Sequence, residues 1–519
     1  MQRRLRIIAI ASLIVLVYLV VPHVGWAQSY TARTDYTAQP YPGTIPCPSA
    51  SGCSGGGALT GAGYCFTPSD FATQICRVTD QSSPGSQPNF GTDCGGSAET
   101  NMMDVSDTRF YVCTGGNVPV MFSFDGTTNP PTTAALYGAM LGGCEAAATY
   151  TLNLTFSYTQ PKVAYAENYH GGNPALCQYD FTSSSTMPTY ANGKITSLVD
   201  LSTCVAGLAG KDYNTIYTED VSPSADDQTF AISGSTTSGQ GSTGDVYVIV
   251  WNRTNGCRVW NTSTGAVTGS WGATGTISKT DTFYLHNVRM NKNGDWVKVS
   301  QNTCIGGGCT SVRNTYLWNI ATLNVYAGVN DATAACGHGT VGYTHWINEC
   351  STGGNNTDFL ERANTSDDAA GVQVTSGFPS PLSVQDAHIS WNNGNSSDTT
   401  PVIMSLYTDD NSTTNACDNE ITAMTTDGTG KMFRFAHTYI TRADIQNFDA
   451  EFAIGNPSQD GKYYFWSTDW EGKLGQIGGG SSACTIGTDC RGDVFFAILS
   501  QSGTALSNGV KLSNGAKIQ

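Results

Sequence analysis

Charged residues are scarce in this chain, and basic residues are scarcer than acidic ones. Only 13% of the 519 residues are Asp, Glu, Lys or Arg, and the formal net charge is −16. Binding to nucleic acid depends on clustered Lys and Arg, so nucleic acid is not an expected partner. The sequence also has no Gly-x-Ser-x-Gly elbow, phosphate-binding loop or His-Glu-x-x-His helix. Common hydrolase and nucleotide chemistries therefore lose support.

Long apolar runs are confined to the start of the chain. Residues 1–6 are basic, residues 7–21 are apolar, and the small residues Gly25 and Ala27 precede Gln28. This order predicts a signal peptide over residues 1–27, with an uncleaved anchor as the alternative. No later segment is apolar enough to cross a bilayer, so the sequence predicts a secreted protein, extracellular or periplasmic. Loss of three leader arginines takes the charge from −16 to about −19.

Cys-x-x-Cys pairs are absent, which disfavours zinc as the explanation for 17 cysteines. All of the cysteines follow the leader, and most have a near neighbour in the sequence. In an oxidising compartment such spacing predicts disulfides that cross-link loops. The neighbouring pairs are 47 with 53, 65 with 76, 94 with 113, 304 with 309, 336 with 350, and 484 with 490. The odd count leaves one thiol unpaired, and the isolated Cys417 is the expected one.

What the chain does contain is a repeated pattern of strand signals without helical periodicity. A polar residue, a few alternating residues, a turn such as Asn293-Gly294 and a further strand recur from near residues 104, 158, 220, 286, 345, 388 and 449. Residues 229–233, 245–251 and 257–260 show that each unit holds about four antiparallel strands. The pattern predicts an all-β fold, a single β-propeller of seven four-stranded blades. Six or eight blades, or a two-layer sandwich, are the alternatives.

The composition divides the chain into three parts. After the leader, residues 28–95 are rich in Gly, Pro, Ser and Cys, which indicates a disulfide-stapled N-terminal extension lying over the main fold. Residues 96–519 are expected to form the propeller. Residues 492–499 should supply a closing strand beside the N-terminal part, because a ring must protect its first and last edges.

Histidines stand at the predicted heads of three successive units. His286, His345 and His388 would open innermost strands at the mouth of the central channel, and Asp449 or Glu451 would do so in another unit. Imidazoles and carboxylates that converge on one axis can bind a divalent transition metal. The simpler interpretation is that each histidine hydrogen-bonds within its own blade and binds nothing.

The segment Gln385-Asp386-Ala387-His388-Ile389-Ser390 and the blade pattern resemble the TolB-type propellers, and among them the oligogalacturonate lyases. That family has a Gln-x-x-His-x-His segment at a manganese site, and Ser390 stands where it has the last histidine. The resemblance implies a manganese site made by His286, His345, His388 and Gln385. It also implies a base that removes the proton acidified by the metal-bound uronate, with His338 and His437 as candidates.

Two further groups could bind ligands. Trp346 and Trp391 lie near the predicted strand heads and could stack on sugar rings, although packing between blades explains such residues equally well. The acidic run of Asp409, Asp410, Asp418 and Glu420 could hold calcium, but it lacks the spacing of a calcium loop and also fits a solvated loop.

Two functions fit these features. The first is a binding or surface-assembly platform for a glycan or an extracellular protein, because a propeller presents loops on a rigid scaffold. The second is a metal-dependent carbohydrate-active enzyme, similar to a polysaccharide lyase, with its site at the channel mouth. The sequence does not predict the oligomeric state.

Overall fold

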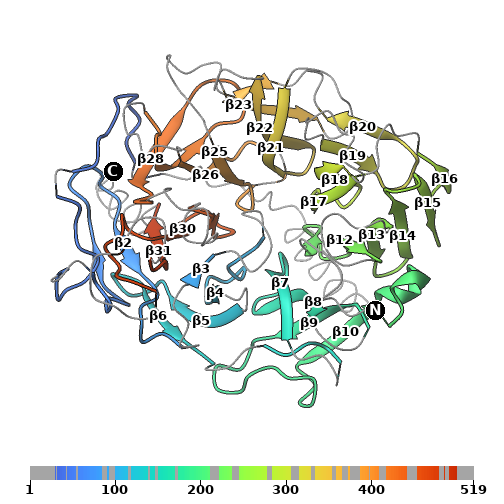
Figure 1. Cartoon of the computed structure of the whole chain (residues 1–519), viewed down its shortest axis with the longest axis horizontal. Helices are drawn as coiled ribbons and strands as arrows, with labels where there is room; N and C mark the ends of the chain where they lie inside the picture. The colour runs from blue at the N-terminus through green and yellow to red at the C-terminus, as the bar shows by residue number, and fades with distance from the viewer. Residues whose placement is uncertain are drawn as a thin grey trace, which may run out of the picture.

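The computed structural model describes a ring of antiparallel sheets around a central axis (Figure 1). The described residues are 30, 32–42, 44–53, 57–84, 90–92, 100–114, 119–137, 141–145, 150–169, 173–210, 221–236, 245–277, 283–304, 315–328, 334–352, 358–364, 372–374, 386–394, 396, 398–407, 416–440, 453–477, 484 and 490–499. They form seven sheets, so the predicted seven-bladed propeller is confirmed and the sandwich is excluded. The predicted leader lies outside these residues, and none of the helices found in the described ranges could span a membrane.

Blades 1 to 3 follow one another along the chain, each running from the axis to the rim. Blade 1 contains β3 (Phe90–Gly91), β4 (Arg109–Thr114), β5 (Pro119–Asp125) and β6 (Thr132–Ala135). Blade 2 contains β7 (Tyr150–Phe156), β8 (Val163–Tyr169), β9 (Ala175–Asp180) and β10 (Ile195–Asp200). Two short 3-10 turns follow, η1 (Leu201–Thr203) and η2 (Ala206–Leu208). Blade 3 contains β11 (Val221–Pro223), β12 (Thr229–Ser235), β13 (Val246–Asn252), β14 (Gly256–Asn261), β15 (Ala266–Gly269) and β16 (Gly275–Thr276).

Blades 4 to 6 each have four strands in the order predicted. Blade 4 contains β17 (Phe283–Met290), β18 (Trp296–Cys304), β19 (Thr315–Asn319) and β20 (Val325–Gly328). Blade 5 contains β21 (Ala334–Val341), β22 (His345–Thr352), β23 (Asp358–Asn364) and β24 (Val372–Gln373). Blade 6 contains β25 (Asp386–Ser390), β26 (Val402–Tyr407), β27 (Glu420–Met424) and β28 (Met432–His437). Five of the seven sheets in the described residues have four strands, while blade 3 has six and blade 7 has five.

Blade 7 joins the two ends of the chain. Its strands β29 (Gly455–Pro457), β30 (Tyr463–Thr468) and β31 (Asp493–Ile498) are completed by β2 (Ile75–Arg77) and β1 (Cys65–Phe66) from the N-terminal extension. In the β2–β31 pair, Cys76 lies opposite Phe496. The predicted closing strand is therefore confirmed, and the extension supplies two strands of the last blade as well as covering it.

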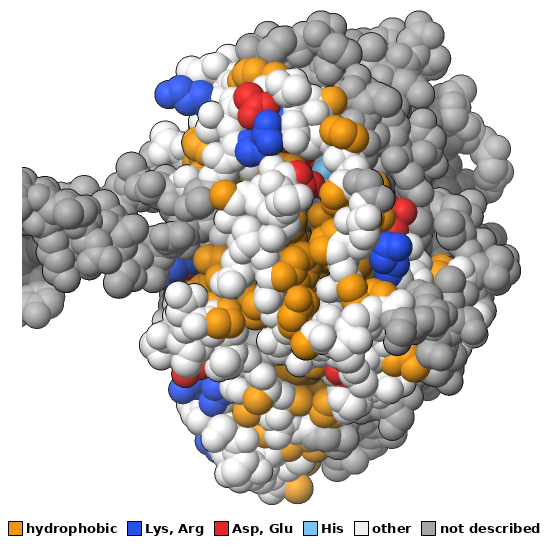
Figure 2. Space-filling model, turned by 90° about the vertical axis from the view of Figure 1, so that its left-hand side faces the viewer, with side chains coloured by type: hydrophobic (Ala, Val, Ile, Leu, Met, Phe, Trp, Pro, Cys, Tyr) orange, Lys and Arg blue, Asp and Glu red, His pale blue; other side chains and the backbone are white. Residues whose placement is uncertain are grey.

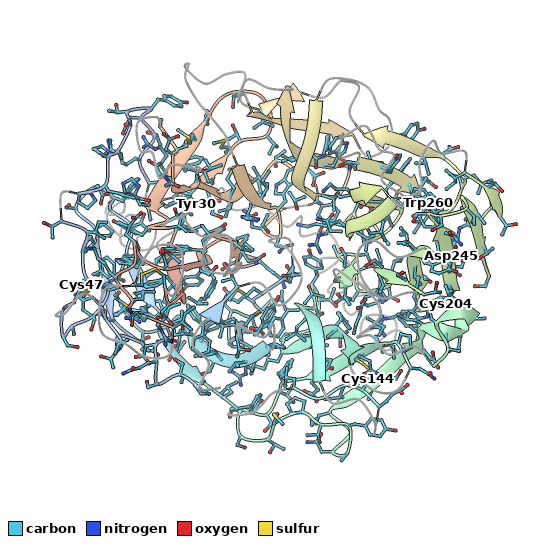
Figure 3. All side chains as sticks on the ribbon, in the orientation of Figure 1. Tyr30, Cys47, Cys144, Cys204, Asp245 and Trp260 are labelled. Atoms are coloured by element: carbon cyan, nitrogen blue, oxygen red, sulfur yellow. A yellow bond between two sulfur atoms is a disulfide. The ribbon has the colours of Figure 1, made fainter. Side chains whose placement is uncertain are left out.

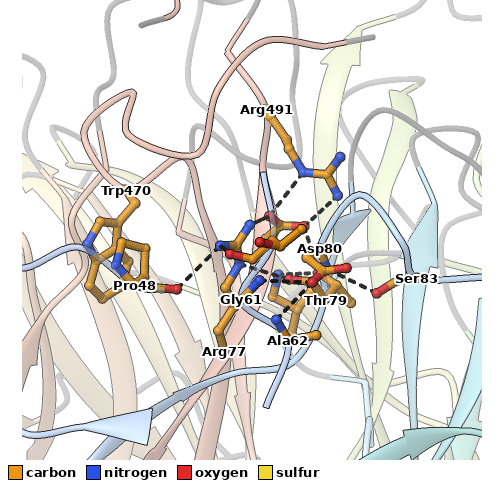
Figure 4. Close-up of polar contacts among 12 residues, drawn as sticks. Pro48, Gly61, Ala62, Arg77, Thr79, Asp80, Ser83, Trp470 and Arg491 are labelled. Atoms are coloured by element: carbon orange, nitrogen blue, oxygen red, sulfur yellow. Dashed lines mark hydrogen bonds and ion pairs between the residues drawn. The ribbon is translucent and has the colours of Figure 1, made fainter. Parts of the chain in front are cut away.

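A buried ion network holds this closing sheet together (Figure 4). The Asp493 carboxylate accepts a hydrogen bond from Arg77 Nη2 at 2.6 Å, from Arg491 Nη2 at 2.9 Å and from Thr79 Oγ1 at 2.9 Å. Arg77 and Asp493 are completely buried and Arg491 is almost so. Buried charges persist where they are paired and hydrogen-bonded, so the two ends of the chain meet at a site where each charge has a partner.

The turn after each innermost strand shows why the sequence pattern recurs. Gly294 and Gly461 have φ of +74° and +69°, and Asp107 and Asp227 have φ of +51° and +56° at the same place in their own blades. Glycine and, less readily, aspartate adopt this left-handed conformation. Aspartate thus replaces the glycine of the expected Asn-Gly turn, which explains why two of the units were only weakly marked.

Apolar side chains fill the space between every pair of neighbouring blades (Figure 3). Between blades 3 and 4 the rings of Trp260 and Trp318 lie 5.9 Å apart. Between blades 4 and 5 the apolar cluster of the described residues is small and consists of Trp296, Leu317, Val341 and Trp346.

Five disulfides are defined by both of their cysteines. Three of them, Cys47–Cys53, Cys65–Cys76 and Cys484–Cys490, are pairs expected from their spacing. Cys144–Cys177 and Cys204–Cys257 join cysteines 33 and 53 residues apart, which spacing alone did not indicate. Cys417 is the free thiol among the described cysteines, as predicted, and it is buried.

Candidate functional site

The central channel has two different ends. At one end lie the short turns that follow the innermost strands, such as residues 224–228, 291–295 and 458–462. At the other end the innermost strands begin, as β11 does at Val221, β25 at Asp386 and β29 at Gly455. We call these the hub end and the connection end.

Polar side chains interlock at the hub end. Lys292 extends from blade 4 to blade 6, where its Nζ donates to the carbonyl oxygens of Trp391 at 2.5 Å, Gly394 at 3.2 Å and Asn392 at 3.4 Å. The hydroxyl of Tyr158, in blade 2, donates to Asn392 Oδ1 at 3.0 Å. These contacts link three blades that are not all neighbours.

The same cluster of polar side chains also contacts blades 1 and 7. Asn392 Nδ2 donates to the carbonyl oxygen of Thr100 in blade 1 at 2.9 Å. Gln459 Nε2, from blade 7, donates to the carbonyl oxygens of Ser157 at 3.0 Å and Met103 at 3.3 Å. We call Tyr158, Lys292, Asn392 and Gln459 the hub. Since the hub joins five blades by side-chain hydrogen bonds, it fixes this end of the channel as a structural element.

Lys292 is a buried cation without a carboxylate in hydrogen-bond contact among the described residues. Its Nζ lies 5.6 Å from the ring centre of Tyr158 and 5.7 Å from that of Tyr343, in cation–π range. Burial lowers the pKa of Lys292 to about 7, and the more distant Asp398 opposes this shift. The ammonium therefore depends on carbonyl dipoles and aromatic faces.

Aspartates join the turns of neighbouring blades at the hub end. Asp398 of blade 6 accepts from the backbone N–H groups of Tyr343 and Thr344, both at 2.8 Å, and contacts His345 Nδ1 at 3.2 Å. Burial opposes ionisation of Asp398, but these hydrogen bonds outweigh it and lower its pKa. Asp227 of blade 3 plays the same part toward blade 2, accepting from Ser157 Oγ at 2.5 Å.

The position expected of His345 is therefore wrong. His345 opens β22, the second strand of blade 5, and not an innermost strand. Its ring lies at the hub end against Asp398, and about a fifth of its side chain is exposed. The error arose because the turn that precedes β22 resembles the head of a unit in sequence.

Three other histidines lie on innermost strands of consecutive blades. His286 is in β17, His338 is in β21 and His388 is in β25. The pairing of β17 with β18 shifts between Leu285 and Asn287, and that of β21 with β22 shifts between Cys336 and Gly339. Bulges of this kind redirect side chains and often occur beside functional sites. The described part includes the side chain of His388, which is 6% exposed, but not those of His286 and His338.

Unpartnered amides lie next to this row of histidines, and the sequence did not single them out. Asn287 Oδ1 and Nδ2, Ser300 Oγ and Asn348 Oδ1 are buried without a hydrogen bond among the described residues. Asn287 and Ser300 face each other across β17 and β18, and Asn348 Nδ2 donates to Thr315 Oγ1 at 3.2 Å. Buried polar atoms normally have partners, so a water or a ligand oxygen fits here. The only sequence signal is that Asn287 follows His286.

Three other predicted site residues pack inside or between blades or against the N-terminal extension. Trp346 and Trp391 are 2% and 0% exposed and pack between blades, so the expectation that their rings stack on sugars is wrong. Trp391 also donates from Nε1 to the carbonyl oxygen of Thr400 at 2.9 Å. His437 lies at the end of β28, the outermost strand of blade 6, and contacts the N-terminal extension instead of the channel.

The remaining candidates lie outside the described residues, namely Gln385, Asp409, Asp410, Asp449 and Glu451. In the acidic run, Asp418 is buried and Glu420 pairs with Arg434 at 2.5 Å. Where side chains are described, no three His, Cys, Asp or Glu residues converge as metal ligands. The amide of Asn287, the imidazole of His388 and the backbone positions of His286 and His338 are the features that fit a divalent ion.

Comparison with known proteins gives a clear result for structure alone. No protein-family model matches the sequence, and no curated protein sequence matches it. An oligogalacturonate lyase in complex with manganese superposes with a TM-score of 0.54 at 10% identity, over 84% of this chain and 96% of that chain. The oligogalacturonate lyase of Vibrio parahaemolyticus gives a TM-score of 0.52 at 10% identity, over 84% and 97% of the two chains.

The chain shares the fold of these lyases. A TolB structure from Agrobacterium tumefaciens also matches, with a TM-score of 0.30 at 9% identity over 53% of this chain and 83% of that chain. The two lyase structures, with TM-scores above 0.5, confirm for the fold the resemblance that the blade pattern indicated. At such low identity the similarity says nothing about which residues act.

Proposed function

We propose that this chain is an exported, disulfide-linked propeller that binds a glycan or an extracellular protein at its connection end. The observation that carries the proposal is the difference between the two ends of the channel. The hub end is occupied by side chains that bond to one another across the ring. The connection end is where the innermost strands begin, after stretches of sequence between blades that are longer than the hub turns, and three of these strands carry histidines. Long loops held on a rigid scaffold are where binding residues concentrate.

The composition favours a neutral, hydroxyl-rich ligand at that end. Only 13% of the residues are charged, and the chain as a whole is rich in Ser, Thr, Asn and Gly. Hydroxyl and amide groups both donate and accept hydrogen bonds, as sugar hydroxyls require. The disulfides are typical of proteins outside the cytosol, where glycans and surface proteins are available.

Two histidines, one on an innermost strand and one at the hub end, give a matched test. The purified protein would be screened on an array of glycans, and the affinity for the best ligand would be measured by calorimetry. His388→Ala, on innermost strand β25, should weaken binding at least about tenfold, which corresponds to about 1.4 kcal/mol. His345→Ala, at the hub end, should leave the affinity unchanged. Equal effects of the two variants, with both still folded, would contradict the proposal.

A metal-dependent carbohydrate-active enzyme is the second candidate, and one observation favours it. His286, His338 and His388 occupy innermost strands of three consecutive blades, beside the unpartnered amide of Asn287. His286, His388 and Gln385 would hold a divalent ion such as manganese, and His338 would be the base. Such an ion would bind a uronate carboxylate and acidify the adjacent C–H bond before elimination.

Elemental analysis separates the two candidates. The enzyme predicts about one transition metal per chain, lost in His388→Ala but kept in His345→Ala, and an unsaturated uronate product detected by its ultraviolet absorbance. The enzyme would be excluded if the purified protein held no metal, took up no manganese and still bound its glycan in chelator. The binding platform would then be the remaining function.

A further inference from the structure

The N-terminal extension crosses the rim of blade 6 before it enters blade 7. We call residues 30 and 32–42 the strap. Arg33 of the strap pairs with Arg434 of β28 by two backbone hydrogen bonds of 2.9 Å, so the strap adds a short edge to blade 6. Figure 2 shows this side of the ring, where apolar side chains gather among few charged ones.

Polar side chains from several elements meet beneath this crossing. Tyr41 comes from the strap, Asp70 from the loop between β1 and β2, His437 and Tyr439 from the end of β28, and Glu471 from the turn after β30. We call these five residues the junction. The ring centres of Tyr41 and His437 lie 4.6 Å apart, and those of Tyr41 and Tyr439 lie 5.5 Å apart.

The junction is buried, but many of its polar atoms have no hydrogen-bond partner. His437 and Tyr439 are 0% exposed, and the side chain of Asp70 is 11% exposed. The buried atoms without a partner among the described residues are both imidazole nitrogens of His437, both carboxylate oxygens of Asp70, the hydroxyls of Tyr41 and Tyr439, and Glu471 Oε1. Buried polar atoms normally have partners, so such a gathering indicates a bound ligand.

Asp70 and His437 are placed as two ligands of one ion would be. His437 Nε2 lies 3.1 Å from Asp70 Oδ2, yet the two atoms are not aligned for a hydrogen bond. Nitrogen and oxygen ligands bind a transition metal at about 2.0–2.2 Å, which leaves two neighbouring ligand atoms about 3.0–3.5 Å apart. The distance fits this geometry, and both atoms have lone pairs free for a third group.

The loop that carries Asp70 is fixed on both sides. Cys65 and Cys76 lie opposite each other in β1 and β2 and are joined by a disulfide, so the loop between them is closed at its base. Phe71, next to Asp70, packs its ring against His437 with the ring centres 5.1 Å apart. Asp70 is therefore held beside the imidazole by the chain on each side of it.

The backbone on the blade side is also constrained. The carbonyl oxygen of Tyr439 accepts from Glu471 N at 2.9 Å and from Thr468 Oγ1 at 2.6 Å. Tyr439, Trp470 and Glu471 have φ of +53°, +53° and +54°, a left-handed conformation that bulky residues rarely adopt. Conformations of this kind cluster at ligand clamps, and here they bring the side chains of two blades to one place.

The charges of the junction favour a cation. Asp70 and Glu471 are two acidic groups, and only Lys473 offsets part of the charge of Glu471. Arg33 donates to the backbone carbonyl oxygen of Asp70 at 3.2 Å and not to its carboxylate. The imidazole and carboxylate together suit a divalent transition ion.

The remaining coordination positions fall to phenol oxygens and water. No third His, Cys, Asp or Glu of the described residues converges with His437 and Asp70. Burial and, to a smaller extent, the Asp70 carboxylate raise the pKa of Tyr439, so its phenol oxygen lies within electrostatic reach of that carboxylate. With so few protein ligands, the site should bind more weakly than a structural zinc site that has four.

We propose that the junction binds a divalent transition metal ion through His437 Nε2 and the Asp70 carboxylate, with the Tyr439 hydroxyl and water as further ligands. The site is separate from the channel, because His437 lies on the outermost strand of blade 6 and His388 lies on the innermost. The ion would link the N-terminal extension to β28, so its role would be structural.

Zinc binding by the full chain tests the site. The protein would be stripped with chelator, and zinc uptake would be measured by calorimetry and by elemental analysis. His388→Ala is the background for every sample, because it removes an imidazole of the channel candidate. In this background about one Zn²⁺ per chain should bind and should raise the unfolding temperature.

Asp70→Asn and a matched control identify the ligand. Asp70→Asn should weaken zinc binding more than about a hundredfold, because loss of a ligand exceeds the effect of changes in the outer shell. Asp125→Asn removes an exposed carboxylate that accepts only from Thr127, and it should bind zinc as the background does. His437→Gln should lose zinc as Asp70→Asn does, and Asp70→Asn decides by itself if His437→Gln does not fold.

Two outcomes would overturn the proposal. One is zinc binding by the unmodified chain that disappears in His388→Ala, since the ion would then belong to the channel, and absence of zinc binding in both proteins has the same consequence. The other is equal affinity of Asp70→Asn and Asp125→Asn. Neither outcome bears on glycan binding, which is measured separately in chelator.

Discussion

Buried charge is handled in opposite ways at the closing sheet of blade 7 and at the hub. At the closing sheet, the Asp493 carboxylate meets two guanidinium groups and a hydroxyl at hydrogen-bond distance. At the hub, the Lys292 ammonium meets three carbonyl oxygens and two aromatic rings. One site compensates charge with charge, and the other compensates charge with dipoles.

The difference explains where the ring should respond to pH. Arginine remains protonated in proteins, so the guanidinium groups of the closing sheet hold their charge. Burial instead lowers the pKa of Lys292 to about 7. The closing sheet of blade 7 therefore keeps its guanidinium charges. Lys292, which crosses the channel, instead loses its positive charge as the pH rises above about 7. The following predictions test this contrast.

The largest effect is expected at the closing sheet. Asp493→Asn would leave two buried guanidinium groups without their carboxylate, and breaking a buried pair in this way costs about 3–5 kcal/mol. Denaturant unfolding of the purified protein would measure the loss in free energy of unfolding. Asp125→Asn is the matched control, because this carboxylate is exposed and accepts only from Thr127. If Asp493→Asn lowered the free energy of unfolding no more than Asp125→Asn does, the Asp493 network would not be what stabilises the closed ring.

The long-range disulfide should matter next. Cys204–Cys257 closes 53 residues and Cys484–Cys490 closes 6. Loop-closure entropy predicts losses of about 4 kcal/mol and about 2 kcal/mol when each pair is changed to alanine. Unfolding of the two double variants under identical conditions gives the comparison. Similar losses would mean that native-state packing, and not chain entropy, sets the contribution of these bonds.

These features differ in how far the sequence could predict them. The seven blades and the closing strand 493–498 follow from period-two alternation and from Asn-Gly or Asp-Gly turns, which are local signals. The cross-links between Cys47 and Cys53 or between Cys65 and Cys76 are local in the same sense. Cys204–Cys257 is not, because it joins a turn after blade 2 to β14 of blade 3 and requires these two blades to pack against each other.

The site was harder to predict for a physical reason. Blade residues at equivalent places in the sequence differ by a bulge or by one strand in space, so His345 lies on β22 at the hub end while His388 lies on innermost β25. The hub itself joins residues more than two hundred positions apart, as with Tyr158 and Asn392. Such contacts form only when the whole ring is closed, so no local sequence pattern predicts them.

A smaller effect, with a specific pH dependence, is expected for Lys292→Met. Loss of the donor leaves three buried carbonyl oxygens unsatisfied, at about 1–3 kcal/mol in all. Because burial lowers the folded pKa of Lys292 to about 7, the unfolded chain binds the extra proton between pH 7 and the ordinary lysine pKa of 10.5. The native lysine therefore adds stability as the pH rises, by roughly 1 kcal/mol per pH unit.

The test is the difference in free energy of unfolding between the unmodified chain and Lys292→Met at about pH 7 and about pH 9, where the linkage slope applies. We expect the difference to grow with pH. Lys473→Met, at a partly exposed lysine of blade 7, controls for loss of a positive charge elsewhere. A difference that shrinks toward pH 9 would mean that the carbonyl oxygens hold Lys292 in its charged form, and the hub would then resemble the closing sheet.

The smallest effect is expected at the hub end, where His345 contacts Asp398. His345→Gln removes a partly exposed ring from Asp398 but leaves the three backbone N–H groups that this carboxylate accepts from. The loss should be less than about 1 kcal/mol, as for other partly exposed pairs. Asp398→Asn should cost more, since the N–H groups lose a charged acceptor. If His345→Gln proved as costly as Asp398→Asn, the histidine would be the group that fixes the turn, and the sequence repeat that placed it at a strand head would reflect a structural requirement of blade 5.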